Sequence, residues 1–184
     1  AIDAGVRSAL IGSLATILIT IAIAFPLGLG AAIWLEEYAT DTWWNRLIRV
    51  NIYNLAGVPS IIYGMLGLAI LVRALGPWTS GAAFGAAADP DSANGRTILS
   101  AGLTLALLVL PTIIINAQEA FRAVPQSLRH SGYAVGATKW QVIHHHVLPA
   151  SLDRVLTGTV IAVSRAIGET APLVVVGAST FLSQ

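Results

Sequence analysis

Long stretches without a charged residue dominate the hydrophobic pattern of this chain. No charge lies between Arg7 and Glu36, and three similar stretches follow, the last interrupted only by Arg165 and Glu169. Each is longer than the roughly 20 apolar residues that a helix needs to cross the hydrocarbon of a bilayer. The pattern predicts an all-α fold, a polytopic transmembrane helical bundle. The four expected spans are about 8–35, 50–72, 97–118 and 155–182.

Composition supports a membrane protein. Charged residues make up 10% of the chain, hydrophobic residues 55%, and the mean hydropathy is +0.75, whereas soluble domains carry about 25% charged residues. The alternative, buried helices in a large soluble protein, is disfavoured because 184 residues make too small a core. The lipid bilayer is therefore an expected partner. The chain opens at Ala1 without a Met or a signal peptide, so we expect it to be part of a longer protein.

Charge and cysteine content exclude several functions. The net charge is +1 and the only Lys is Lys139, which gives no basic cluster for nucleic acid. Because the chain has no Cys, it has no disulfide, thiolate nucleophile or Cys-ligated metal.

The distribution of Lys and Arg among the connections predicts the orientation. The connections 36–49 and 119–154 carry most of these residues, so both are expected in the cytoplasm. This places Ala1, the loop 76–95 and Gln184 on the outer side.

The longer cytoplasmic connection has the signals of two short helices. Pro125 suits a helix start, Gly136 suits a helix end, and Thr138 with Gln141 has the spacing of a capping box. Pro149 is expected to end the second helix before the last span. The connection is therefore predicted to be an ordered, bent loop.

This loop is similar to that of permease subunits of bacterial ABC importers, whose signature reads E-A-A-x3-G-x9-I-x-L-P. The matching positions here read His130-Ser131-Gly132, Gly136 and His146-Val147-Leu148-Pro149. His130 stands where the family has Glu, and His146 where it has Ile. The resemblance implies a loop that docks in a groove on a cytoplasmic ABC ATPase dimer. The residues implied in this coupling are Leu128, His130, Ser131, Gly132, Gly136, Ala137, Thr138, Leu148 and Pro149.

Three segments narrow the resemblance to phosphate importer permeases of the PstA type. They read NLAGVPSIIYG at 54–64, EAFRAVPQSLR at 119–129 and SRAIGETAPLVVVGAS at 164–179. The sister PstC type tends to have Met where Ala171 stands. The resemblance implies one ABC transporter transmembrane domain over residues 1–184, in a bacterial cytoplasmic (inner) membrane. It also implies a homologous permease subunit and an external phosphate-binding protein as partners.

Energy supply is expected from another subunit. A P-loop needs GxxxxGK[ST], and the single Lys follows Thr138, so this chain cannot hold ATP in that way. We therefore expect a non-catalytic permease without a cofactor of its own, with ATP and Mg²⁺ bound by the ATPase partner.

The charged pair in the last span is the main site candidate. Arg165 lies about 15 Å along that span, near the midplane, and Glu169 lies one turn further on the same face. Placing a charged side chain at the bilayer centre costs about 3 kcal/mol, so such a residue is expected to pair with another group or to line a substrate pathway. In the functional hypothesis Arg165 binds phosphate through its planar fork, while Glu169 orients Arg165 or accepts a hydrogen bond from a protonated phosphate oxygen. A salt bridge that only locks two helices together is the alternative.

Residues in the second span form a weaker candidate. Gly57 and Pro59 are expected to break that helix, and a broken helix can line a cavity, so Ser60 and Tyr63 are candidate pathway residues. Close packing explains the glycines equally well.

Further breaks are expected at Pro111 and Pro172, the latter leaving the carbonyl of Gly168 without its helical partner. No metal is expected at His144–His146, because consecutive helical side chains point about 100° apart.

These observations predict a permease subunit of an ATP-driven importer of inorganic phosphate, with a pathway shared with the sister subunit. An ABC importer permease for phosphonate, sulfate or molybdate is one alternative. An ion-coupled secondary transporter, with Arg165 and Glu169 as a relay, is another, although internal repeats would be expected there. A membrane enzyme lacks a supporting constellation of residues.

Overall fold

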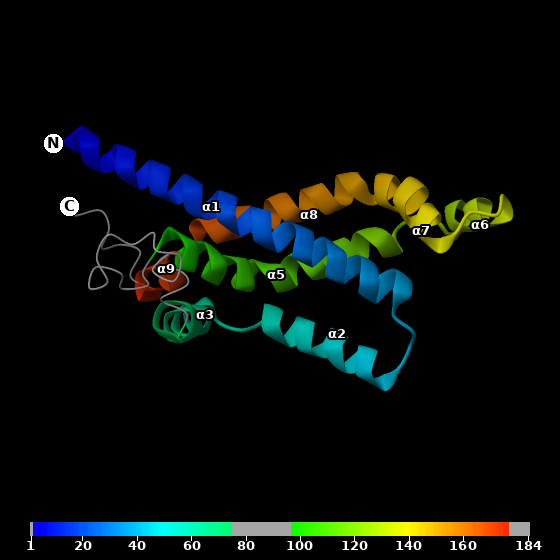
Figure 1. Cartoon of the computed structure of the whole chain (residues 1–184), viewed down its shortest axis with the longest axis horizontal. Helices are drawn as coiled ribbons and strands as arrows, with labels where there is room; N and C mark the ends of the chain where they lie inside the picture. Colours follow the sequence, from blue (N-terminus) through cyan, green and yellow to red (C-terminus); the bar gives the residue numbers. More distant parts are fainter. Residues whose placement is uncertain (1, 75–96, 177–184) are drawn as a thin grey trace. The chain divides into compact units, whose positions relative to one another are not determined.

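The computed structural model describes residues 2–74 and 97–176, with side chains from residue 10 onward. This part of the chain consists of helices and short links, without a strand, and confirms the all-α class (Figure 1). The loop 76–95, the end of the fourth predicted span at 177–182, and both terminal residues lie outside the described residues.

Three helices in the described residues are long and apolar enough to cross a membrane: Leu10–Tyr38, Ile98–Arg122 and Lys139–Gly168. The first combines α1 (Ile2–Ile33) with the π-helical turn η1 (Trp34–Tyr38), and the second is α5. The third combines α7 (Lys139–Val142), the π-helical turn η4 (Ile143–Val147) and α8 (Leu148–Gly168).

A fourth span is present only if a bent pair of helices is counted as one. The pair joins α2 (Trp43–Ala56) to α3 (Ser60–Gly67), which continues as η2 (Leu68–Ala74). The interruption expected at Gly57 and Pro59 lies between α2 and α3. Proline has no N–H to donate and disfavours a helical conformation in the residue before it, so the second helix starts after Pro59.

Other proline predictions differ from the structure. Helix α5 is continuous through Pro111, contrary to the break expected there. The sequence predicts that Pro149 ends a helix. In the structure it is instead the second residue of α8, which follows η4 directly. Proline fits this position because the N–H of Leu148 already bonds five residues back to Ile143, which widens the turn ahead of the ring.

Pro172 also lies in a first helical turn. Helix α8 ends at Gly168, and α9 (Ala171–Val176) begins three residues later, so the break covers Glu169 and Thr170. A missing N–H costs little in the first turn because those N–H groups have no helical partner. The break therefore precedes the proline.

The chain divides into two compact units. Among the described residues, unit 1 comprises 2–24, 57–74, 97–109 and 163–176, and unit 2 comprises 25–56 and 110–162. In unit 1, small residues bring helices close: a Cβ on Gly64 would lie 2.7 Å from the Cα of Pro172, so α3 packs on α9. Thr20 Oγ1 donates to the carbonyl of Gly102 at 3.1 Å. Such close approach by small residues is typical of membrane helices.

Unit 2 has a contiguous apolar core around Phe121, whose side chain is fully buried. The other members come from η1, α1, α5, the following link, and the α7–α8 segment: Ala32, Leu35, Ile114, Ala117, Ala120, Val124, Val142, Val147 and Val155. This core holds the ends of the long helices and the loop between them in one unit.

Candidate functional site

Arg165 and Glu169 meet at the end of α8 in unit 1. Arg165 Nε lies 3.6 Å from Glu169 Oε1, and the two side chains are 53% and 20% exposed. Glu169 lies in the break after α8, and its N–H donates to Ala166 O at 3.2 Å, one residue short of the α-helical spacing. The structure thus brings together the pair that the spacing predicts. Because one carboxylate cannot use all five guanidinium N–H groups, Arg165 keeps donors for an oxyanion.

Ser60 and Tyr63 lie in the same unit, on α3. Ser60 is the first residue of this helix, and Tyr63 precedes the buried Gly64 that contacts Pro172. Helix α3 therefore packs against the helix that starts directly after the break at Glu169. The role of Ser60 and Tyr63 in a pathway stays a prediction.

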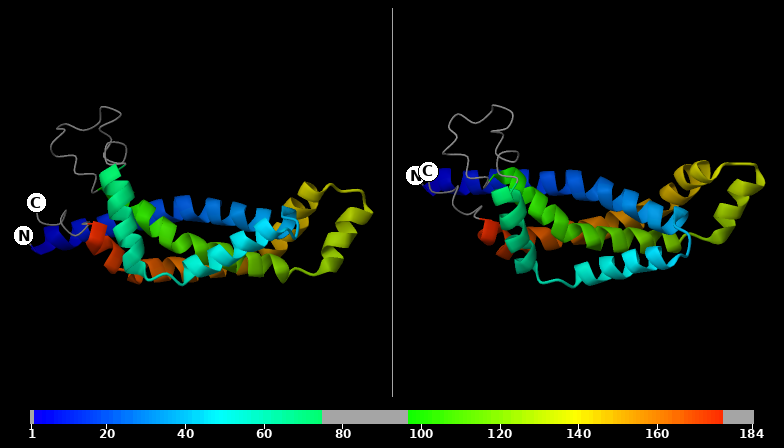
Figure 2. Two further views of the ribbon diagram at one scale, coloured as in Figure 1. Left: turned by 90° about the horizontal axis from the view of Figure 1, so that it is seen from below. Right: turned by 60° about the horizontal axis from the view of Figure 1, so that its bottom comes forward.

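The loop with the ABC-importer signature lies in unit 2 and contains two helices. Helix α6 (Gln126–Ala134) follows Pro125, and α7 begins after Thr138. Both views of Figure 2 show α6 beside the segment formed by α7 and η4. A Cβ on Gly132 would lie 2.8 Å from Val142 Cγ2, so a larger residue there would separate the two helices.

The bend between these helices has the predicted signals. Gly136 has a φ of +81°, a conformation that glycine adopts without steric cost, and Ala137 N–H bonds Gly132 O at 3.2 Å. Thr138 N–H donates to Gln141 Oε1 at 2.8 Å, and Gln141 N–H donates to Thr138 Oγ1 at 3.4 Å. The helix start at Pro125, the helix end before Gly136 and the capping box are confirmed.

The signature residues differ in exposure. Leu128, His130, Ser131, Gly136 and Thr138 are exposed, whereas Gly132 is buried between the helices. Ala137 and Leu148 are partly buried, and Pro149 is exposed. His130, which replaces the family's Glu, lies at the surface, so its ring disturbs no packing within this chain.

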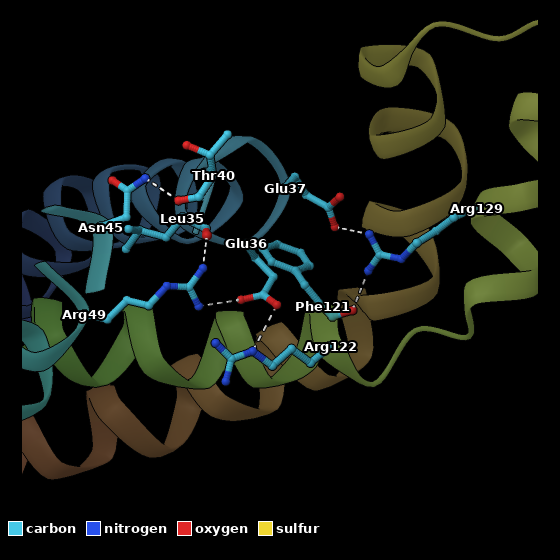
Figure 3. A network of polar contacts seen from close by, with 9 residues as sticks. All are labelled: Leu35, Glu36, Glu37, Thr40, Asn45, Arg49, Phe121, Arg122 and Arg129. Atoms are coloured by element: carbon cyan, nitrogen blue, oxygen red, sulfur yellow. Dashed lines mark hydrogen bonds and ion pairs between the residues drawn. The ribbon is translucent and has the colours of Figure 1, made fainter. Parts of the chain in front are cut away.

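A cluster of five charged residues in unit 2 was not predicted. This arginine–glutamate cluster consists of Glu36 and Glu37 from η1, Arg49 from α2, Arg122 from α5 and Arg129 from α6 (Figure 3). Glu36 accepts from Arg49 Nη1 at 3.3 Å and from Arg122 Nε at 3.0 Å. Glu37 accepts from Arg129 Nη1. The cluster connects four helical elements.

Two of these arginines also bind backbone carbonyls at helix ends. Arg49 Nη2 donates to Leu35 O, and Arg129 Nη2 donates to Phe121 O at 2.8 Å. The last carbonyls of a helix lack helical partners and carry partial negative charge. Each arginine therefore joins a carboxylate to a helix terminus. The only signal in the sequence was the position of these residues next to the uncharged stretches, which does not show which charges pair.

The histidines at 144–146 have different surroundings. Within residues 2–74 and 97–176 there is no group of three His, Cys, Asp or Glu that could hold an ion. His145 Nδ1 lies 3.1 Å from Gln141 O, and the His144 ring lies 5.9 Å from that of Trp140. His146 lies against Gly132.

Comparison with known proteins gives similar sequences among bacterial phosphate-transport permeases. The chain is 37% identical over 164 residues to the phosphate transport system permease protein PstA homolog of Mycoplasma pneumoniae, covering 89% of this chain and 24% of that protein. It is 37% identical over 193 residues to the phosphate transport system permease protein PstC of Xylella fastidiosa, covering 97% and 58%. The chain thus spans less than two thirds of these relatives.

The fold is similar to that of a solved ABC transporter. An inward-facing structure of the MetNI methionine ABC transporter matches with a TM-score of 0.59 at 18% identity, over 89% of this chain and 68% of that one. The model of the family described as "binding-protein-dependent transport system inner membrane component" matches residues 24–184. Since that match covers most of the chain, the protein belongs to this family of inner membrane transport components.

Proposed function

We propose that this chain is the permease subunit of an ATP-driven importer of inorganic phosphate. It passes phosphate inward along a pathway shared with a homologous permease subunit. The names of the relatives support phosphate as the substrate. The pair Arg165 and Glu169 carries the proposal, because it supplies the chemistry that binds a partly protonated oxyanion.

Arg165 is suited to bind the anion. Its planar guanidinium fork matches two oxygens of phosphate. The side chain is half exposed in this chain, and Glu169 approaches only at 3.6 Å. The ligand can therefore reach the guanidinium without first breaking a tight ion pair.

Glu169 is suited to select among anions. Near neutral pH, phosphate carries a proton that a carboxylate can accept in a hydrogen bond, whereas sulfate does not. A carboxylate close to the bound anion would repel a fully ionised one. In this arrangement Arg165 provides the affinity for phosphate, and Glu169 provides the preference for phosphate over sulfate.

The energy comes from a partner in this proposal. The bent loop of α6 and α7 docks on a cytoplasmic ATPase dimer that holds ATP and Mg²⁺, and an external phosphate-binding protein delivers the anion. The exposed Leu128 and the ordered Gly136 turn suit a docking surface of fixed shape. The chain itself performs no reaction and uses no cofactor.

Reconstitution tests the proposal. The full-length protein is placed in liposomes with its ATPase, sister permease and binding protein, and uptake of labelled phosphate is measured with and without ATP. We expect uptake that needs ATP hydrolysis and survives a proton ionophore. Uptake without the ATPase, or uptake abolished by the ionophore alone, would refute an ATP-driven importer. ATP-dependent uptake of sulfate in preference to phosphate would refute the proposed substrate.

A further inference from the structure

The arginine–glutamate cluster lies where the loop joins the long helices, and the proposed function gives its residues no role. All five members belong to unit 2. The connection from α5 to α6 consists of residues 123–125, which are not helical. Such a link, taken alone, lets α6 turn relative to α5. Val124 of this link packs in the apolar core, and α6 packs on α7 and η4, so a direct contact between α6 and the end of α1 would complete this support.

The ion pair of Glu37 and Arg129 supplies that contact (Figure 3). Their side chains are only 7% and 13% exposed, so solvent screens the pair far less than it screens a surface salt bridge. Arg129 also donates to Phe121 O at 2.8 Å. One guanidinium thus connects α6 with η1 and with the end of α5.

Arg129 has little freedom to move in this position. Its Nε is buried without a hydrogen-bond partner among the described residues, so its pairing depends on Glu37 and Phe121. If the guanidinium left Glu37, both charges would remain buried and uncompensated. The pair therefore resists separation of α6 from η1.

Glu36 extends the same connection to two more helices. Each of its oxygens accepts from a different arginine, Arg49 at 3.3 Å and Arg122 at 3.0 Å. Because Glu36 and Glu37 are adjacent, the end of α1 is bound to α2, α5 and α6 through two neighbouring side chains.

The loop is internally ordered, so fixing α6 fixes the rest of it. The close contact at Gly132 holds α6 to α7 and η4, and the capping box sets the start of α7. A force applied anywhere on the loop is therefore delivered to α6. From there the force reaches α8 through the continuous helix Lys139–Gly168, and it reaches α1 and α5 through the apolar core and through the connection between α6 and η1.

We propose that Glu37 and Arg129 are positioning residues that hold α6 against the end of α1 throughout the transport cycle. A displacement of the loop by the ATPase is then passed to α1 and α5 together, instead of being lost at residues 123–125. This inference rests on the proposed function for its source of motion. The connection itself rests only on the contacts within unit 2.

Spin labels on α6 and after η1 test the connection directly. The chain contains no Cys, so Thr40→Cys and Ala134→Cys give two unique labels in it, both at exposed positions outside the cluster. The distance between labels is measured in the assembled complex, without nucleotide and with ADP trapped by vanadate after ATP hydrolysis. We expect a narrow distribution, unchanged by nucleotide. In the Glu37→Gln variant, which keeps the shape but removes the charge, we expect a broad distribution that shifts with nucleotide.

A second measurement reads the consequence for transport. The ATP hydrolysed per phosphate taken up is compared among complexes assembled to equal yield. Glu37→Gln should raise this ratio about fivefold or more, the lower range of typical coupling between sites. Arg129→Lys keeps the positive charge but loses the planar guanidinium, and should raise the ratio of ATP to phosphate less than Glu37→Gln does. Asp41→Asn, which removes the exposed ion pair with Arg46, is the matched control and should leave the ratio unchanged.

The outcomes separate the two proposals. A label distance that changes with nucleotide in the unsubstituted protein overturns the positioning role, as does a narrow, unshifted distribution in Glu37→Gln. Loss of assembly in Glu37→Gln with a normal ratio in Arg129→Lys also overturns it, because the pair would then serve stability alone. Absence of ATP-dependent phosphate uptake in the unsubstituted complex refutes the proposed function, while the breadth of the label distances without nucleotide still decides the connection.

Discussion

The charged groups at the end of α8 and those at the end of α1 are bound in opposite ways. Arg165 has one carboxylate partner at 3.6 Å and is 53% exposed. Arg129 binds a carboxylate and a backbone carbonyl and is 13% exposed. The Arg165 guanidinium is open to a ligand from solvent, whereas the Arg129 guanidinium is buried against its partners.

This difference separates a site for ligands from a site for structure. A side-chain cation that binds and releases an anion must interact less strongly with the rest of its own protein than with that anion. A structural cation must interact strongly with the protein itself. Both regions contain Arg and Glu, so residue type alone does not distinguish them. The number of partners and the burial of each guanidinium do.

The strongest test of the comparison removes the buried cation. Arg129→Gln leaves Glu37 buried at 7% exposure without its partner, and should lower the free energy of unfolding by about 3–5 kcal/mol. Arg46→Gln removes an arginine that is 71% exposed in its ion pair, and should cost less than about 1 kcal/mol. Denaturant unfolding of the full-length protein in detergent measures both. Equal losses for the two variants would mean that burial does not set the strength of these pairs.

Removal of the exposed cation should affect transport rather than folding. Arg165→Gln deletes charge-assisted hydrogen bonds to phosphate, each contributing about 1.5–3 kcal/mol, so we expect uptake to fall about 100-fold with assembly intact. Arg154→Gln, the same change near the start of α8 at an exposed position, is the control and should transport normally. Normal uptake by Arg165→Gln would assign this pair to structure.

The acidic partner gives a smaller and more specific effect. In Glu169→Gln the amide can donate as well as accept, so a fully ionised anion is no longer repelled. We expect the preference for phosphate over sulfate to fall about tenfold, the value of one hydrogen bond to a charged group. Competition of sulfate against labelled phosphate uptake measures it, with Glu119→Gln, at an exposed position on α5, as the control. An unchanged preference would limit Glu169 to orienting Arg165.

The smallest expected effect concerns the stiffness of the loop that the cluster holds. Gly136 has a φ of +81°, and a Cβ added to it would meet no atom within 4 Å, so Gly136→Ala adds backbone strain without a clash, about 1 kcal/mol. Gly30 has equally open surroundings but lies inside a helix, where Ala is preferred, so Gly30→Ala should stabilise by about 0.5–1 kcal/mol. Thermal unfolding of the two variants should therefore move in opposite directions. If both substitutions shifted the unfolding temperature in the same direction, the positive φ of Gly136 would not be what requires glycine at the bend.

Local features were predictable from the sequence because their causes lie within a few residues. The capping box of Thr138 and Gln141 needs two side chains three residues apart, and the turn at Gly136 needs only one glycine. The ion pair of Arg165 and Glu169 was predictable for the same reason, since residues four apart in a helix share a face.

The cluster was not predictable because its partners are far apart in sequence. Arg122 lies 86 residues from Glu36, and Arg129 lies 92 residues from Glu37. Several arginines flank the apolar stretches, and only the packing of α1, α5 and α6 decides which of them meets an acid. The helix end expected at Pro149 was wrong for a different reason: the rule for helix breaking does not apply in a first turn, where Pro149 lies. The helix expected to break near Pro172 is indeed interrupted, between Gly168 and Ala171.

The burial of the ion pair of Glu37 and Arg129 also has a consequence for the evolution of the sequence. A substitution at Glu37 strands a buried charge, and so does one at Arg129, so a lineage can lose this pair only by changing both positions in close succession. His130, the next residue along α6, is exposed and is under no such constraint from a partner. Packing within this chain therefore constrains Arg129, whereas only a docked partner could constrain His130.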